Sequence, residues 1–398
     1  MQAITEKINS IFTGRRFNFL AFRLIAWMIL IAYLNTFSAS FHFDDHTSIV
    51  ENYALKVLSW ENFMSMFSGT RPVVNLSLFF NYQLSGLHVV GWHIFNIFFH
   101  IMNSYFVYLL ILRTLGLPSL SERYGDRARR IAIFGALLFG LHPIQTESVT
   151  YIISRTELLA AFFYLATFLL FIKGAQTNRF YYYIACFFTS LFAVESKEWA
   201  VTLPAMLFLY DYLFLSDSTL KPVFSRWKAY ILVALPWGLI TYVMMTTNLS
   251  GAGFGITSEG RITPVTYLLT SFNVLWTYIR ILFFPFNQNL DYSYPIAKTL
   301  FEFPTILSFA GHLFVVITAF LLYRRKKWTL IPFGIAWFYI TLSPTQSFVP
   351  ILDVIFEHRV YLPSIGFFIA FIMAFEGIFE WFGKRKALKL STNVSKSS

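Results

Sequence analysis

Long apolar runs separated by short polar stretches fill the chain from residue 19 to residue 382. A helix that crosses a membrane needs ~20 mostly apolar residues, and runs close to that length recur along the whole sequence. They predict membrane-spanning helices over 19–38, 92–112, 131–149, 155–173, 180–195, 198–215, 229–246, 267–285, 305–323, 329–347 and 360–382. The pattern therefore predicts an all-α, polytopic integral membrane protein with about 10–12 transmembrane helices.

The stretch 60–91 is less apolar than a span and contains Arg71-Pro72, Gly86 and Gly91. Its aromatic and leucine positions predict interfacial helices that lie along the membrane surface. They belong to the first external loop, 39–91.

Basic residues set the expected orientation. Lys7, Arg15 and Arg16 precede the first span, which then acts as an uncleaved signal anchor, and the arginine-rich stretch 113–130 falls on the cytoplasmic side. A single transmembrane catalytic domain is expected over 1–383, followed by a basic, disordered cytoplasmic tail over 384–398.

The basic cluster at 324–327 conflicts with this count, because eleven full crossings put it outside. One solution makes 267–285 a re-entrant or strongly tilted segment that returns to the outer side. A twelfth span restores the parity equally well. In the first solution 285–304 and 348–359 join Asp44 on the outer face.

Composition supports the membrane class. Hydrophobic residues make up 57% of the chain and charged residues only 13%, against about 25% charged in soluble domains. The net charge of +11 comes from short basic tracts between apolar runs, so it reflects topology and nucleic-acid binding is excluded. The single cysteine, Cys186, can form no internal disulfide.

Two adjacent carboxylates, Asp44 and Asp45, follow the first span, with His42 and His46 beside them. Neighbouring carboxylates can split their proton affinities, which favours a catalytic base at this site. An aspartate before Thr47 would also suit a helix N-cap, although a cap needs only one. A divalent cation held by the two aspartates and two histidines is a further possibility.

Many other polar residues fall at the outer ends of the predicted spans, and intramembrane charges commonly face a bundle interior and pair with one another. They predict a polar cavity on the outer face; the alternative is that each residue sits in headgroup water. These residues are Arg71, His142, Glu147, Arg155, Glu157, Glu195, Lys197, Glu198, Arg261, Asp291, Glu357, His358 and Arg359, with Tyr292 next to Asp291.

Two of the cations invite a specific interpretation. Arg359 precedes the last span and would grip a phosphate through a forked pair of hydrogen bonds, or would instead anchor the helix by snorkelling. Lys197 has the same phosphate interpretation, but its neighbours Glu195 and Glu198 would also neutralise it.

Short motifs in a fixed order resemble the transmembrane and tetratricopeptide-repeat (TMTC-like) O-mannosyltransferases over roughly residues 40 to 380. Each motif alone is weak, and the ordered set is fairly specific. The motifs are Phe43-Asp44-Asp45-His46, Ile49-Val50-Glu51-Asn52, Arg71-Pro72, the run from Leu141 to Val149, Ser196-Lys197-Glu198, the run from Leu290 to Pro295, and the run from Glu357 to Ser364.

The resemblance implies a C-type glycosyltransferase fold and a sugar donor carried on a polyprenyl phosphate. It implies Asp44 as catalytic base, with Asp45 second. The chemistry also needs cations on the departing phosphate, for which Arg359, His358, Lys197 and Arg71 are the candidates. Direct displacement would invert the anomeric carbon, without a metal or other cofactor.

The sugar, mannose by resemblance, and the acceptor stay open, because no tetratricopeptide repeats follow Gly383. The acceptor is a hydroxyl of a protein, a glycan or a lipid. The site is expected on the non-cytoplasmic face of a prokaryotic inner membrane or of the endoplasmic reticulum. The main alternative is a transporter or flippase of a lipid-linked substrate, although no paired halves with broken helices are visible; a non-catalytic scaffold is the third.

Overall fold

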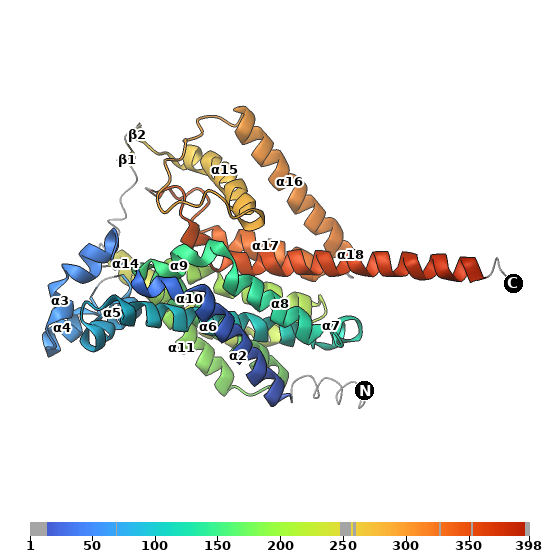
Figure 1. Cartoon of the computed structure of the whole chain (residues 1–398), viewed down its shortest axis with the longest axis horizontal. Helices are drawn as coiled ribbons and strands as arrows, with labels where there is room; N and C mark the ends of the chain where they lie inside the picture. The colour runs from blue at the N-terminus through green and yellow to red at the C-terminus, as the bar shows by residue number, and fades with distance from the viewer. Residues whose placement is uncertain are drawn as a thin grey trace.

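The structure is a computed structural model, and it describes residues 14–68, 70–246, 256–257, 260–325, 328–351 and 353–394. Helices pack side by side in a bundle, from which α15 and α16 project on one side and the end of α18 extends alone (Figure 1). The described strands are one short antiparallel pair, β1 (Ile256–Thr257) and β2 (Gly260–Arg261). The predicted all-α class is confirmed.

The first half of the chain forms a series of helices in which short 3-10 and π segments, labelled η, alternate with α-helices. They are α2 (Arg15–Ala32), η1 (Leu34–Ser38), η2 (His46–Val50), α3 (Tyr53–Lys56), α4 (Trp60–Ser65), α5 (Pro72–Ser85), α6 (Val89–Leu115), α7 (Pro118–Tyr124), α8 (Ala128–Leu141), η3 (Pro143–Gln145), α9 (Thr146–Thr150), η4 (Ile152–Ser154) and α10 (Arg155–Thr177).

The second half continues in the same way and ends in the longest helix. Its elements are α11 (Tyr181–Ser196), η5 (Glu198–Thr202), α12 (Leu203–Tyr210), η6 (Asp211–Leu215), α13 (Leu220–Ser225), α14 (Trp227–Thr246), α15 (Pro264–Phe283), α16 (Phe303–Arg324), α17 (Leu330–Leu342), η7 (Glu357–Val360) and α18 (Pro363–Val394).

Four of the described helical segments are long and apolar enough to cross a membrane: Val89–Leu115, Ile152–Thr177, Phe303–Arg324 and Pro363–Phe382. They differ in how they pack. The segment that contains α10 is 67% buried within the protein, whereas α16 is only 11% buried. The α10 segment therefore lies inside the bundle. An apolar helix with few protein neighbours needs an apolar surrounding, so α16 is expected to face lipid. The polytopic membrane fold is thereby confirmed.

The predicted span 131–149 ends early, at Leu141. Pro143 lacks an N–H and restricts the residue before it to extended backbone, and His142 accordingly has ψ 132°. The His142 Nδ1 atom accepts a hydrogen bond from the Ile144 N–H at 3.2 Å and so starts the next short helix. The break places Glu147 on α9, outside the membrane-spanning segments.

Other helix boundaries in the structure also differ from the predicted ones. The stretch 198–215 is divided among η5, α12 and η6, and the stretch 60–91 contains the short helices α4 and α5. The segment 267–285 corresponds to α15, one unbroken helix, so the tilted form of that prediction fits it better than the re-entrant form. Helix α18 runs through Val394, into the stretch expected to be disordered. Lys7 and the pair at 326–327, which the topology used, lie outside the described residues.

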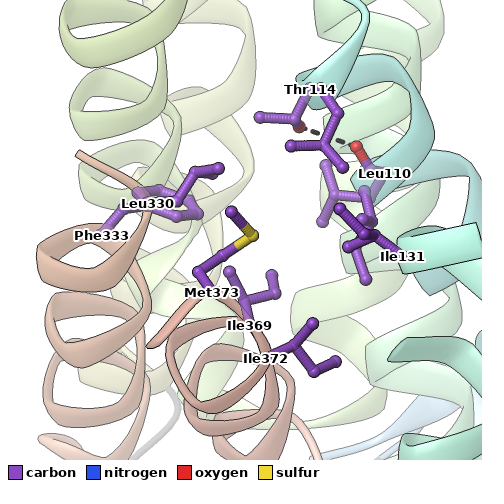
Figure 2. A pocket seen from close by; sticks show the side chains of 10 residues that line it. Leu110, Thr114, Ile131, Leu330, Phe333, Ile369, Ile372 and Met373 are labelled. Atoms are coloured by element: carbon purple, nitrogen blue, oxygen red, sulfur yellow. Dashed lines mark hydrogen bonds between the residues drawn. The ribbon is translucent and has the colours of Figure 1, made fainter. Parts of the chain in front are cut away.

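A small apolar cavity lies between α6, α8, α17 and α18 (Figure 2). Its volume is about 20 Å³, room for about one water molecule. Thr114 is the polar residue in the lining of this cavity. Its hydroxyl donates to the Leu110 carbonyl at 2.7 Å and is also hydrogen-bonded to the Tyr210 hydroxyl. The cavity is therefore an interior packing gap and offers no free polar group to a ligand.

Helices α17 and α18 cross through a pair of glycines. A Cβ atom on Gly366 would lie 2.5 Å from the Gly334 carbonyl oxygen, and one on Gly334 would lie 2.3 Å from the Gly366 carbonyl oxygen. Small residues allow this close approach between membrane helices. The Trp337 Nε1–H also donates to the Leu362 carbonyl at 3.0 Å. This crossing fixes the start of α18 and with it η7, which carries His358 and Arg359.

We expect Gly366→Ala to destabilise the protein by about 1–3 kcal/mol, since the new methyl group meets backbone atoms that cannot move aside. The matched control is Gly238→Ala on α14, where a Cβ would meet nothing within 4 Å. That change should be neutral or slightly stabilising, because alanine favours helix. Thermal unfolding of the purified variants in detergent measures both effects. Equal melting temperatures for the two variants would contradict the close crossing.

Candidate functional site

The two aspartates of the first external loop have different environments. Asp45 is 1% exposed, and its carboxylate accepts the His42 N–H at 3.1 Å and the Ile153 N–H at 2.8 Å. Asp44 is exposed, and its backbone N–H donates to the Tyr151 hydroxyl at 3.0 Å. Asp45 therefore ties the loop to the start of the α10 segment. The exposed Asp44 carboxylate lies beside the Tyr151 hydroxyl.

The N-cap interpretation of this pair is wrong. Asp45 directly precedes η2, but its side chain makes no cap hydrogen bond there. Burial raises the pKa of Asp45, while the two backbone N–H groups and the positive charge of Arg155 act in the opposite direction.

Arg155 does not face the outer cavity. It is fully buried, donates to the Asn81 side-chain oxygen at 2.9 Å, and lies over the rings of Trp92 and Phe95. Because these partners belong to α5 and α6, Arg155 braces those helices against the start of α10. Its role is to support the loop that carries Asp45.

The histidines of the first loop do not assemble a metal site with the aspartates. Across the described parts of the chain, no group of three or more His, Cys, Asp or Glu side chains is arranged to hold a metal ion. His46 is exposed, and His42 has its Nε2 atom 3.2 Å from the Ser40 hydroxyl.

A polar cavity of about 270 Å³ opens beside this loop. It is lined by His42, Thr146, Glu147, Thr150, Tyr151, Gln288, Asn289, Leu290 and Glu357. Tyr151, which binds the Asp44 backbone, is part of its wall, so Asp44 lies at the edge of the cavity. The cavity thus brings together the first loop, α9, the 288–290 stretch and η7, as the outer-face prediction required.

Glu357 shapes the wall of this cavity. It is 2% exposed, and its carboxylate accepts hydrogen bonds from the Gln288 side chain at 2.5 Å, from the Asn289 N–H at 2.8 Å and from the Tyr292 hydroxyl. Asp291 is exposed, in the same turn. Glu357 and Tyr292 therefore hold the loop in place, and the Glu357 carboxylate is fully occupied.

Glu147 and His358 form a tight pair inside the cavity. Glu147 accepts the His358 N–H at 2.9 Å, and its other oxygen lies 2.5 Å from His358 Nδ1. Burial raises the pKa of Glu147 to about 7 and lowers the pKa of His358 to about 3. Both shifts favour the uncharged forms of the two side chains.

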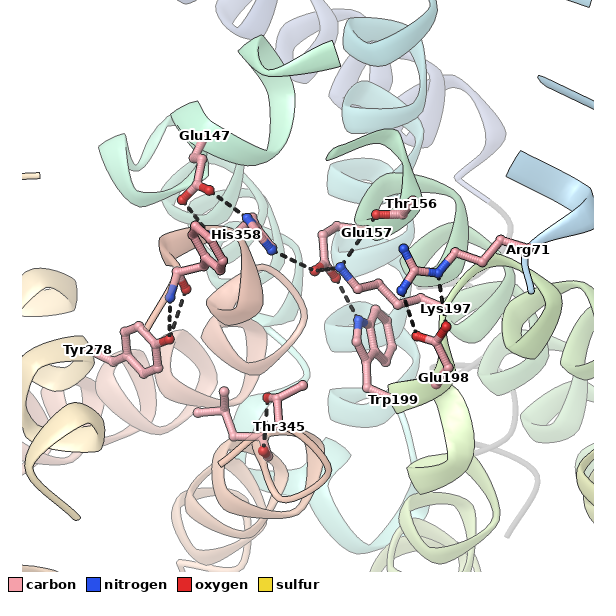
Figure 3. A network of polar contacts seen from close by, with 12 residues as sticks. Arg71, Glu147, Thr156, Glu157, Lys197, Glu198, Trp199, Tyr278, Thr345 and His358 are labelled. Carbon is pink, nitrogen blue, oxygen red and sulfur yellow. Dashed lines mark hydrogen bonds and ion pairs between the residues drawn. The ribbon is translucent and has the colours of Figure 1, made fainter. Parts of the chain in front are cut away.

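The remaining charges continue from His358 into the bundle (Figure 3). Lys197 Nζ lies 2.6 Å from Glu157, which also accepts the Trp199 indole N–H at 2.6 Å. The His358 Nε2 atom is 3.9 Å from the same carboxylate. Glu157 is 1% exposed and is the centre of the network. The sequence places it among the outer-face charges but assigns it no specific role. The signal for it was a carboxylate in the first turn of an apolar span, beside Arg155.

Arg71 and Glu198 close the network on the side of α5. The two guanidinium nitrogens Nε and Nη2 each lie 3.0 Å from a Glu198 oxygen. This forked pair lowers the pKa of Glu198, although partial desolvation of the half-exposed carboxylate acts in the opposite direction. Arg71 and Lys197, two of the predicted phosphate ligands, are thus each neutralised by a glutamate.

Arg359 has a different environment from the other cations of this network. It is 9% exposed, and among the described residues no carboxylate lies within 4.0 Å of its guanidinium. Its Nη1 atom is buried without a hydrogen-bond partner, and the group lies over the Phe356 ring at 5.3 Å. The guanidinium also lies beside the Tyr267 hydroxyl and near Glu147, which lines the cavity. A buried guanidinium without a carboxylate partner has the chemistry of an anion site.

Comparison with known proteins gives an independent result. The human protein O-mannosyl-transferase TMTC4 is 28% identical over 215 residues, which cover 48% of this chain and 29% of the relative. The Caenorhabditis elegans protein O-mannosyl-transferase F38B6.6 is 24% identical over 390 residues, which cover 91% of this chain and 52% of the relative. Human TMTC3 is 31% identical over 208 residues, 47% of this chain and 21% of the relative.

The chain spans about half the length, or less, of these curated relatives. No family model matches it, and no solved structure matches it. The resemblance that the ordered motifs carry is nevertheless confirmed. The chain is similar to TMTC4 and TMTC3 over about half of its length and to the protein O-mannosyl-transferase F38B6.6 over 91% of it.

Proposed function

We propose that the protein transfers a sugar, mannose, from a polyprenyl-phosphate donor to an acceptor hydroxyl on the non-cytoplasmic face of the membrane. The names of its relatives support mannosyl transfer and a protein hydroxyl as acceptor. The observation that carries the proposal concerns the polar cluster of Glu147 and His358. An exposed carboxylate, Asp44, lies at the edge of its cavity, and a buried guanidinium without a carboxylate partner among the described residues, Arg359, comes directly after His358.

Asp44 is the general base in this proposal. Its carboxylate takes the proton of the acceptor hydroxyl while the hydroxyl oxygen attacks the anomeric carbon of the sugar. The bond between that carbon and the phosphate oxygen breaks on the opposite face, and the electron pair leaves with the lipid phosphate. One displacement inverts the anomeric centre, and no covalent sugar–enzyme intermediate forms.

Arg359 holds the departing phosphate. Negative charge grows on the phosphate as its bond to the sugar breaks, and a fixed cation away from bulk water stabilises that charge. The Nη1 atom of Arg359 has hydrogen-bonding capacity that no described residue uses. No metal ion or other cofactor is invoked, because the arginine supplies the counter-charge.

The other three candidates do not contact the phosphate in this proposal. Instead, Lys197, Arg71 and His358 hold the surrounding elements in place. Lys197 and Arg71 are held by Glu157 and Glu198, and His358 is held by Glu147 through Nδ1. These pairs join η5 to α10 and to the start of α5, and η7 to α9. They also keep the site net positive only where Arg359 lies, which directs a phosphate to that position.

The first prediction concerns the base. Asp44→Asn should lower the rate of mannosyl transfer from polyprenyl-phosphate mannose by about 10²–10⁴-fold, since the amide cannot accept the proton. Donor binding should change little. Turnover and ligand-induced thermal stabilisation of the purified protein measure the two effects. The control is Glu61→Gln, an exposed carboxylate of the same external loop. Equal turnover by Asp44→Asn and wild type would remove Asp44 from this role.

The second prediction concerns the phosphate. Arg359→Gln should weaken donor binding by about 10–100-fold, the effect of losing a hydrogen bond to a charged group. Arg359→Lys keeps the charge but loses the forked pair of hydrogen bonds, so its donor affinity should lie between those of wild type and Arg359→Gln. The melting temperature without donor should not fall, because the arginine has no carboxylate partner to leave unpaired. Arg179→Gln, an exposed cation, is the control. Unchanged donor affinity in Arg359→Gln would contradict the assignment.

The third prediction separates position from contact at Lys197. Lys197→Met leaves the Glu157 carboxylate buried without its cation, so we expect a loss of about 3–5 kcal/mol in the free energy of unfolding. The double variant Lys197→Met with Glu157→Gln should recover most of that loss, as thermal unfolding will show. A single variant that is as stable as wild type but fails to bind donor would instead make Lys197 a direct phosphate ligand.

A further inference from the structure

A second polar cavity lies at the other end of the bundle from the candidate site. It has a volume of about 730 Å³ and opens between the ends of α6 and α10, the start of α2 and the segment from η6 to α13. Lys173 on its wall follows Glu157 along the same helix, roughly 24 Å further at 1.5 Å per residue. The cavity is thus separate from the proposed transferase site.

Three cations from three different elements face this cavity: Arg113, Lys173 and Arg226. Arg226 is already paired, with its Nη1 atom 2.7 Å from the Asp211 carboxylate. Asp211 does not line the cavity; Asp217 is the acidic residue on the wall, and it is exposed. Among the described residues neither Arg113 nor Lys173 has a carboxylate within 4.0 Å.

The two unpaired cations keep donors available. Arg113 makes one hydrogen bond, from Nη1 to the Leu169 carbonyl at 3.1 Å, although a guanidinium carries five N–H groups. Lys173 Nζ lies 5.2 Å from the centre of the Tyr182 ring. Asn18, on the same wall, accepts the Tyr108 hydroxyl at 2.8 Å through its side-chain oxygen, so its amide N–H₂ group remains available.

The wall also carries apolar side chains, among them Leu109, Leu112 and Phe214, together with the polar Ser119, Gln176 and Thr177. Arg113 lies in the last turn of α6, a membrane-spanning helix, at the end that the basic stretch 113–130 assigns to the cytoplasmic side. A cavity that combines cations and apolar side chains at this end of a membrane-spanning helix matches a phospholipid, with its headgroup phosphate on the cations and its chains along the apolar side chains.

We infer that this cavity binds the headgroup phosphate of an anionic phospholipid, held by Arg113, Lys173 and the Asn18 amide. The lipid binds at the inner leaflet and joins the ends of α2, α6 and α10, the helices that meet around the cavity. This site does not depend on the proposed transfer reaction, because no residue of the outer cluster contributes to it.

The test is binding of phosphatidylglycerol and phosphatidylcholine to the purified full chain in a non-ionic detergent, read as thermal stabilisation and by native mass spectrometry. Wild type should bind phosphatidylglycerol at least about 5-fold tighter, the effect of one cation near an anionic headgroup. The double variant Arg113→Gln with Lys173→Gln should lose that preference. Lys228→Gln, an exposed cation near the start of α14 outside the cavity wall, should keep it.

Equal affinity for the two lipids in wild type, or an unchanged preference in the double variant, would overturn the inference. Inorganic phosphate is the second probe: if it stabilises wild type and displaces phosphatidylglycerol at millimolar concentration, the cavity is a free-anion site and the lipid assignment fails. A diazirine-bearing phosphatidylglycerol provides a readout on wild type alone. It should label residues 109–119 or 173–177, and labelling confined to other segments would contradict the site.

Discussion

The structure depends on the pairing of charges that are buried at the outer end of a helix bundle. An unpaired charge in such a place costs several kcal/mol, and each pair is stable only while its geometry is kept. Glu157 is 1% exposed and is held by Lys197 and the Trp199 indole. Glu147 and His358, whose uncharged forms are favoured, are joined by a hydrogen bond beside that pair. The partners lie far apart in the sequence, so these contacts fix α9, α10, η5 and η7 relative to one another.

Two groups stand outside this pairing, and they are the two that the proposed chemistry needs. Asp44 is displayed to solvent because its neighbour Asp45 anchors the loop. Arg359 is buried beside the network, and its Nη1 atom has no partner among the described residues. A general base must meet a mobile acceptor, and a phosphate site must keep a cation uncommitted until substrate binds. The paired charges stabilise the arrangement of the helices, and Asp44 and Arg359 remain available to the substrates.

Much of this could be predicted from the sequence, since apolar runs indicate spans and the ordered motifs indicate the outer cluster. The different roles of Asp44 and Asp45 could not, because they depend on the Ile153 N–H, more than one hundred residues away. Glu157 could be placed among the outer-face charges, but its central role could not be predicted, because its partner Lys197 belongs to another helix junction. The early end of α8 was foreseeable, since Pro143 disfavours helix at the residue before it.

The most direct test of the central claim is an experimental structure of the Asp44→Asn variant with polyprenyl-phosphate mannose bound. The account predicts the donor phosphate within hydrogen-bond distance of Arg359 Nη1, with the anomeric carbon turned toward residue 44 and the Glu157–Lys197 pair intact. A phosphate bound instead to Lys197 or Arg71, with either glutamate pair broken, would contradict the division between framework and substrate-binding charges. A donor bound away from the outer cluster would contradict the site itself.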